Sequence, residues 1–172
     1  NWYSSDSRLI PWAYQGAVAT EYARSRGLAL DEWTAQAQVR PGEVISVRQF
    51  LALLVPLQRS AKDSAFVLGQ MGLPGHYGLA SQALQQAHNL TEALQLLARY
   101  AARLSPLLTP RLLVQEHETI LYWTDACGLP GAQRAFVVDM QMSAVTAMAQ
   151  WLGGARLPWR YSFNRTRPRD LS

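Results

Sequence analysis

The spacing of apolar residues changes near residue 111, and this change limits the folds open to the chain more than any other feature. Before it, apolar side chains recur every three to four residues, which is typical of helices with one apolar face. After it come two runs rich in β-branched and aromatic residues, 111–118 and 119–125, and then helical spacing returns. Helical and strand-like segments in separate blocks indicate the α+β class.

Caps and helix-stopping residues predict a series of helices in the first half. A helix over 13–26 should stop at Gly27, because glycine readily takes the left-handed conformation that ends helices. Asp31 is expected to cap a short helix that carries Trp33, and Asp63 to cap another.

Two stretches have the spacing of a capping box, in which a polar residue and a Gln or Glu three positions later satisfy each other's backbone N–H groups. Ser46 and Gln49 form the first, and Pro56 is expected to kink the helix that follows or to begin a new one. Asn89 and Glu92 form the second. It opens the clearest helix of the chain, expected over 90–104, with this apolar stripe: Leu90, Leu94, Leu97, Ala101 and Leu104.

The second half is predicted to pair strands and then to add a long helix. The short link 117–119 between the two β-rich runs favours a hairpin. A helix over 133–152 follows, with Ser143 on its polar side, and the alternating segment 159–164 is typical of a third strand. We expect a helical first half, then an antiparallel or mixed sheet of about three strands packed against two long amphipathic helices.

The composition indicates one globular domain over residues 1–172, since 49% of the residues are hydrophobic and 16% are charged. A single cysteine excludes an internal disulfide. We find no signal peptide and no uninterrupted apolar run long enough to span a membrane, so we expect a soluble, cytoplasmic protein. Five arginines near the carboxyl end suit either a solvated terminal segment or phosphate contacts: Arg156, Arg160, Arg165, Arg167 and Arg169.

The sequence shows no recognisable catalytic machinery. It lacks a Gly-x-Ser-x-Gly elbow, and Cys127 has no evident histidine partner, so a structural thiol is the better interpretation. The histidines do not pair at metal-ligand spacing, and the neighbours of His117 on a strand would point to the opposite face. We therefore expect no catalytic residues, no metal and no cofactor.

Binding is the function that the residues favour. Aromatic side chains gather where the predicted sheet meets the helices, with arginines and a glutamine among them, as in many small-molecule pockets. An arginine there could hold a ligand carboxylate, although core packing is the more common role of any single aromatic residue. The candidate ligand-binding residues are Tyr100, Arg103, Arg111, Gln115, Tyr122, Trp123, Trp159 and Tyr161.

Three runs have a familiar order and spacing: Phe-Val-Leu-Gly at 66–69, His-Tyr-Gly-Leu at 76–79, and Leu-Thr-Glu-Ala-Leu at 90–94. Together they resemble the amino-terminal effector domain of AraC-type transcription regulators, in the group called arabinose-binding-like. The segment from 158 to Pro168 is similar to the family's strand ending in Phe-x-His-x-x-Pro, but Asn164 stands in place of the histidine. The similarity extends over about residues 14–168.

The resemblance implies a cytoplasmic sensor. A small-molecule effector would bind the domain and shift its conformational equilibrium, which requires that it prefer one state over the other. An attached DNA-binding domain would then engage its operator differently. Because family members usually continue into two helix-turn-helix motifs, we expect residues 1–172 to be a fragment of a longer regulator, a sensing and dimerisation domain that reaches DNA only through the missing part.

Three other functions stay open at this stage. The domain could be a ligand-independent dimerisation or structural module of the same regulator, with its aromatic residues filling the core. It could be an enzyme of unrecognised type, which would need a nucleophile and a base together in a cleft. It could also bind nucleic acid directly, with a steep salt dependence. The sequence does not identify the effector.

Overall fold

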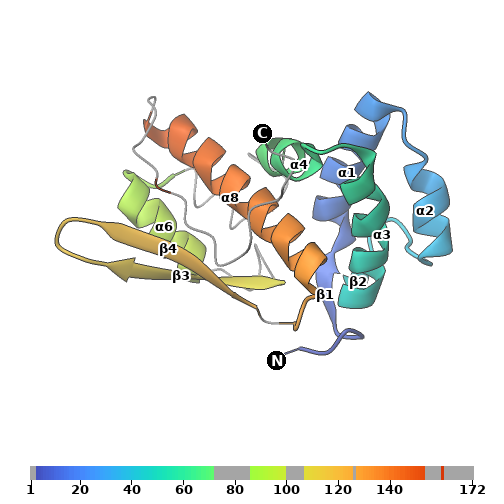
Figure 1. Cartoon of the computed structure of the whole chain (residues 1–172), viewed down its shortest axis with the longest axis horizontal. Coiled ribbons are helices and arrows are strands. Elements are labelled where there is room, and N and C mark those ends of the chain that lie inside the picture. Colours follow the sequence, from blue (N-terminus) through green and yellow to red (C-terminus); the bar gives the residue numbers. More distant parts are fainter. Residues whose placement is uncertain (1–2, 72–85, 100–106, 126, 154–159, 161–172) are drawn as a thin grey trace.

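A computed structural model of the chain describes residues 3–71, 86–99, 107–125, 127–153 and 160 (Figure 1). Over these residues the fold is α+β, as the change in spacing predicted. Figure 1 shows the first four helices and a small sheet at one end, a hairpin and one helix at the other, and α8 running between them. The elements are β1 (Arg8–Pro11), α1 (Trp12–Arg26), α2 (Leu30–Gln36), β2 (Val44–Ser46), α3 (Val47–Ser60), α4 (Ser64–Met71), α6 (Leu90–Arg99), β3 (Leu108–Val114), β4 (Thr119–Asp125) and α8 (Gly131–Gly153).

β1 and β2 form an antiparallel pair that the sequence did not predict. Ile10 pairs with Ile45, and both side chains are fully buried. The backbone N–H of Trp12 then donates to the carbonyl oxygen of Glu43 at 2.9 Å. The pair therefore fixes the start of α1 beside the start of α3.

α1 ends as predicted. Gly27 has φ 64°, in the left-handed region, and its N–H lies 3.4 Å from the carbonyl oxygen of Arg24. The next N–H, that of Leu28, donates to Ala23 at 2.9 Å. These two bonds make a Schellman motif, which directs the chain from α1 toward α2.

The expected cap of α2 was wrong by two residues. The helix begins at Leu30 with Ala29 at the N-cap position, and Asp31 lies in the first turn. Burial explains the earlier start, because Leu30 is only 5% exposed and packing can outweigh capping preference.

The capping box of Ser46 and Gln49 is confirmed at the start of α3. The Gln49 N–H donates to the Ser46 hydroxyl at 3.1 Å, and the Ser46 N–H donates to the Gln49 side chain at 2.9 Å. Pro56 lies inside α3 and does not begin a new helix. The α3 residues that face the core are Val47, Phe50, Leu53, Leu54 and Leu57.

α4 and α8 pack very closely. A side chain added at Gly69 would overlap the carbonyl oxygen of Met140 and lie 2.8 Å from the Cβ of Ser143. Ser143 is 8% exposed, so its assignment to a polar outer side was wrong. Its hydroxyl satisfies its bonding need by donating to the carbonyl oxygen of Phe66 at 2.8 Å.

The second capping box is confirmed on one side only. The Glu92 N–H donates to the Asn89 side chain at 2.8 Å, but the Glu92 carboxylate accepts from the N–H of His88, one residue earlier, also at 2.8 Å. Leu94 and Leu97 are buried, as the stripe predicted. The part of the predicted helix after residue 99 lies outside the described residues.

The predicted hairpin is confirmed with shifted bounds. β3 begins at Leu108, three residues before the predicted start, so Pro110 lies within the strand, and the link runs from Gln115 to Glu118. The described strands form two separate two-stranded sheets, and the expected third strand over 159–164 falls almost entirely outside the described residues. The long helix over 133–152 exists as α8, although its main contacts are with α4 and not with a sheet.

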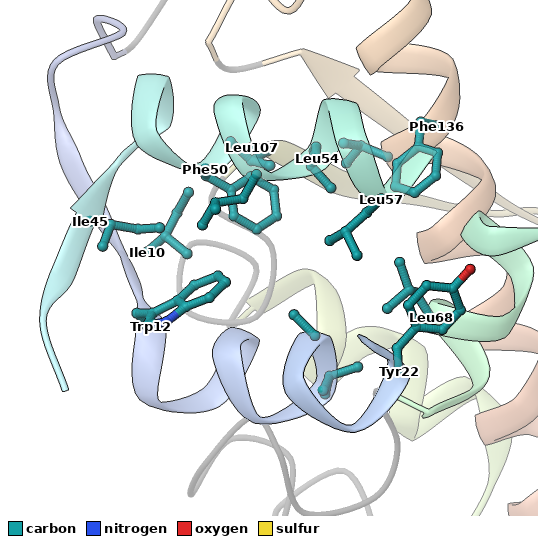
Figure 2. Close-up of a cluster of buried hydrophobic side chains, with 14 of the residues drawn as sticks. Ile10, Trp12, Tyr22, Ile45, Phe50, Leu54, Leu57, Leu68, Leu107 and Phe136 are labelled. Atoms are coloured by element: carbon teal, nitrogen blue, oxygen red, sulfur yellow. The ribbon is translucent and has the colours of Figure 1, made fainter. Parts of the chain in front are cut away.

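The core lies between α1 and α3 and extends to α4 and α8 (Figure 2). In Figure 2, Trp12, Ile45 and Phe50 meet at one end, and Tyr22 lies near Leu68 at the other. The void beside Trp12 and Phe50 measures only about 20 Å³. This part of the interior is therefore too well packed to hold a ligand.

Candidate ligand-binding groove

A groove of about 540 Å³ lies between α2 and α3, on the side of α3 away from the core. This volume is within the roughly 300–1,000 Å³ range of small-molecule sites. Six of its nine lining residues are hydrophobic, although polar and apolar atoms contribute almost equally to its exposed wall. The lining residues are Leu28, Trp33, Gln36, Ala37, Ala52, Val55, Pro56, Arg59 and Ser60.

Gln49 holds one end of the groove in place. Its side-chain amide donates to the carbonyl oxygens of Ala37 at 3.2 Å and Gln38 at 3.0 Å, just after α2. Gln38 has φ 53°, a backbone conformation that residues other than glycine seldom adopt, and these bonds help to maintain it. The side chain that caps α3 therefore also ties the end of α2 to α3.

The Schellman motif sets the other end. Because the N–H of Leu28 donates a hydrogen bond to the carbonyl oxygen of Ala23 in α1, the position of Leu28 in the groove wall follows from the way α1 ends. Gly27 makes this turn possible, since its φ of 64° suits glycine best. The short helix α2 is thus fixed at both ends.

Few of the lining residues have polar side chains. Arg59 is the one charged residue among those that line it, and none of them carries a carboxylate. Arg59 is exposed, and none of the ion pairs found in the described part of the chain includes it. The Ser60 hydroxyl is engaged within the protein, since it donates to Leu57 at 2.6 Å and lies 3.0 Å from the Tyr22 hydroxyl. Among its side chains, the groove can therefore offer apolar surface, one cation and the amide of Gln36.

The residues predicted from sequence lie elsewhere. Arg111 and Tyr122 are paired across the hairpin and are both exposed, so the structure brings these two together. Trp123 pairs with Pro110 on the opposite face and packs against the core, and Gln115 is exposed in the hairpin link. The other four lie outside the described residues: Tyr100, Arg103, Trp159 and Tyr161.

Sequence reasoning missed the groove because its walls come from three separate segments. Trp33 was noted only as part of a short helix, and nothing local links it to Arg59. The available signals were Trp33 on a helix too short to bury it alone, and Gly27 just before that helix.

Cys127 shows no sign of nucleophilic activation. Burial raises the pKa of its thiol, and the nearby Asp125 carboxylate raises it further. Since the thiolate is the reactive form, both effects lower reactivity. Among the described residues, no three His, Cys, Asp or Glu side chains are placed to share a metal ion. In the same residues, no helix has the length and apolar character needed to span a membrane.

Comparison with known proteins agrees with the resemblance found in the sequence. A family model described as the arabinose-binding domain of AraC transcription regulator, N-terminal, matches residues 27–172. No curated protein matches the chain. The matched span includes every residue that lines the groove between α2 and α3. The chain therefore belongs to the family of N-terminal arabinose-binding domains of AraC-type transcription regulators.

Proposed function

We propose that this domain senses a small-molecule effector, which binds between α2 and α3, and that binding changes how an attached DNA-binding domain engages its operator. Family membership supports a regulatory, ligand-sensing role. The observation that carries the choice of site is the groove itself, which combines ligand-sized volume, an aromatic side chain and a cation.

The groove is well placed to transmit a change. α3 lines it with one side and packs against α4, α8 and the strands β1 and β2 with its core side. An effector that bound more tightly to one spacing of α2 and α3 would therefore bias the packing of α3 on the rest of the domain. Equal affinity for both arrangements would shift nothing.

A thermal-shift screen of a metabolite library against the wild-type domain tests this proposal, because a ligand of the native state raises the melting temperature. The hits are then measured on Trp33→Ala and on Tyr122→Ala, which removes an exposed aromatic ring from the hairpin. We expect the shift to be lost in the first variant and kept in the second. The reverse pattern would show that the groove is not the site.

The hairpin is the second candidate site, because Arg111 and Tyr122 are cross-strand neighbours with exposed side chains. Arg111 and Tyr122 belong to the eight ligand-binding residues predicted from the sequence, and this second candidate keeps that whole set as a proposal. The cytoplasmic location, the homodimer and the contact with DNA through a further domain belong to the same proposal. Their support is the family alone.

A further inference from the structure

We infer that the groove between α2 and α3 takes an apolar monocarboxylate and not a free sugar. This inference rests on the proposed function, because it names the chemical class of the effector at the same site. It goes beyond the family description, which refers to arabinose.

Charge is the first reason. Arg59 lines the groove, no carboxylate lines it, and Arg59 has no ion-pair partner among the described residues. Arg26, by contrast, already has a partner, since its guanidinium lies 3.4 Å from the Asp63 carboxylate. A guanidinium without an ion-pair partner, such as that of Arg59, can bind a carboxylate through two parallel hydrogen bonds.

The apolar wall is the second reason. Trp33 lines the groove together with Leu28, Val55 and Pro56, and each of these four side chains is partly buried. Their partial exposure leaves apolar surface in contact with water. A ligand with a flat or aliphatic body would remove that surface from water and gain free energy in proportion to its area.

The small number of polar side chains in the wall argues against a sugar. A pentose carries a hydroxyl group on nearly every carbon, and each one that leaves water needs a partner in the protein. The wall side chains that carry polar groups for this are Gln36, Arg59 and Trp33, whose indole N–H can only donate, because the Ser60 hydroxyl already contacts Leu57 and Tyr22. A carboxylate on an apolar body needs only the arginine.

Three carboxylates and their primary amides test the inference: 2-naphthoate, cinnamate and decanoate, with L-arabinose as the sugar. Each amide keeps the shape of its acid and removes the charge. Dissociation constants are measured by calorimetry on the wild type, on Arg59→Gln and on the control Lys62→Gln. Lys62 is exposed, does not line the groove, and its substitution changes the net charge equally. The indole N–H signal of Trp33, assigned with Trp33→Phe, reports where each probe binds.

We expect at least one carboxylate to move the Trp33 signal, and to bind at least about tenfold more tightly than its amide. Arg59→Gln should remove this preference, while Lys62→Gln should keep it. Equal binding of acid and amide, or no effect of Arg59→Gln, would overturn the inference about charge.

The inference would also be overturned if L-arabinose moved the Trp33 signal and none of the three carboxylates did. A Trp33 signal that no probe moves would overturn it as well. The proposed function is judged separately, by the library screen. A library hit that depends on Trp33 keeps the groove as the effector site even when the carboxylates fail.

Discussion

The hydroxyl of Ser143 donates a 2.8 Å hydrogen bond to the carbonyl oxygen of Phe66, across 77 positions of sequence. The bond joins α8 to α4 beside Gly69, where the two helices are in close contact. Both elements fall within the family match. The crossing therefore connects the helical half of the domain to the half that carries the hairpin.

Gly69→Ala should destabilise the domain by about 2 kcal/mol or more, because the new methyl group would overlap the backbone of Met140 and force α4 and α8 apart. Urea denaturation measures the loss. Gly131→Ala is the matched control, since nothing lies within 4 Å of the added carbon at the start of α8. It should leave stability unchanged or raise it by up to about 1 kcal/mol. Equal effects of the two substitutions would contradict the close packing.

Gln49→Glu should separate the two roles of that side chain. A carboxylate still accepts from the N–H of Ser46, so the capping box survives. It cannot donate to Ala37 and Gln38, so the tie between α2 and α3 is lost. We expect the amides of α2 to exchange faster with deuterium while the first turn of α3 stays protected, and any ligand of the groove to bind more weakly. Gln49→Ala lacks both the accepting oxygen and the donating N–H, so exchange should become faster in α2 and in the first turn of α3. Unchanged exchange in α2 would show that the tie is unimportant.

Glu92 should titrate below its ordinary pKa of 4.5, because the backbone N–H of His88 donates to its carboxylate, and the His88 ring adds a second contact. A lowered pKa in the folded state means that the contribution to stability is present above the ordinary value and is lost as the pH falls through the folded value. Carbon-13 NMR of the carboxyl group measures it. Glu92→Gln removes the titration and should leave the start of α6 equally stable across this range. A pKa at or above 4.5 would refute the contact with His88.

Cys127 should react with iodoacetamide several-fold more slowly than a cysteine in a short peptide, since burial and the Asp125 carboxylate raise the pKa of the thiol. The test is a rate measurement at pH 8 with and without urea. Unfolding should bring the rate to that of the peptide. Fast reaction in the folded protein would instead indicate an activated thiol.

Local signals predicted the helices and the hairpin well. Gly27 ends α1, Ser46 and Gln49 cap α3, and the two β-rich runs pair as a hairpin. At the helix ends the interacting residues lie three to five positions apart, and in the hairpin the two strands follow each other directly across a short link, so each pattern contains its own partner.

The features that the sequence did not predict depend on distant residues. β1 and β2 are four and three residues long and lie more than thirty positions apart, too short for any period to show. Ser143 looked like an outer polar residue because its partner, Phe66, is on another helix. The groove was missed for the same reason, since Trp33 and Arg59 meet only after α2 folds against α3.

The turn at Gly27 has a consequence for genetics. Its φ of 64° penalises every residue with a side chain, although nothing lies within 4 Å of the place where that side chain would begin. A side chain at position 27 would therefore not contact an effector in the groove. It would still displace Leu28, the next residue, which lines the groove. Selections for altered inducer response should recover substitutions at position 27. These would change the shape of the groove through the backbone and could be mistaken for substitutions of a residue that contacts the effector.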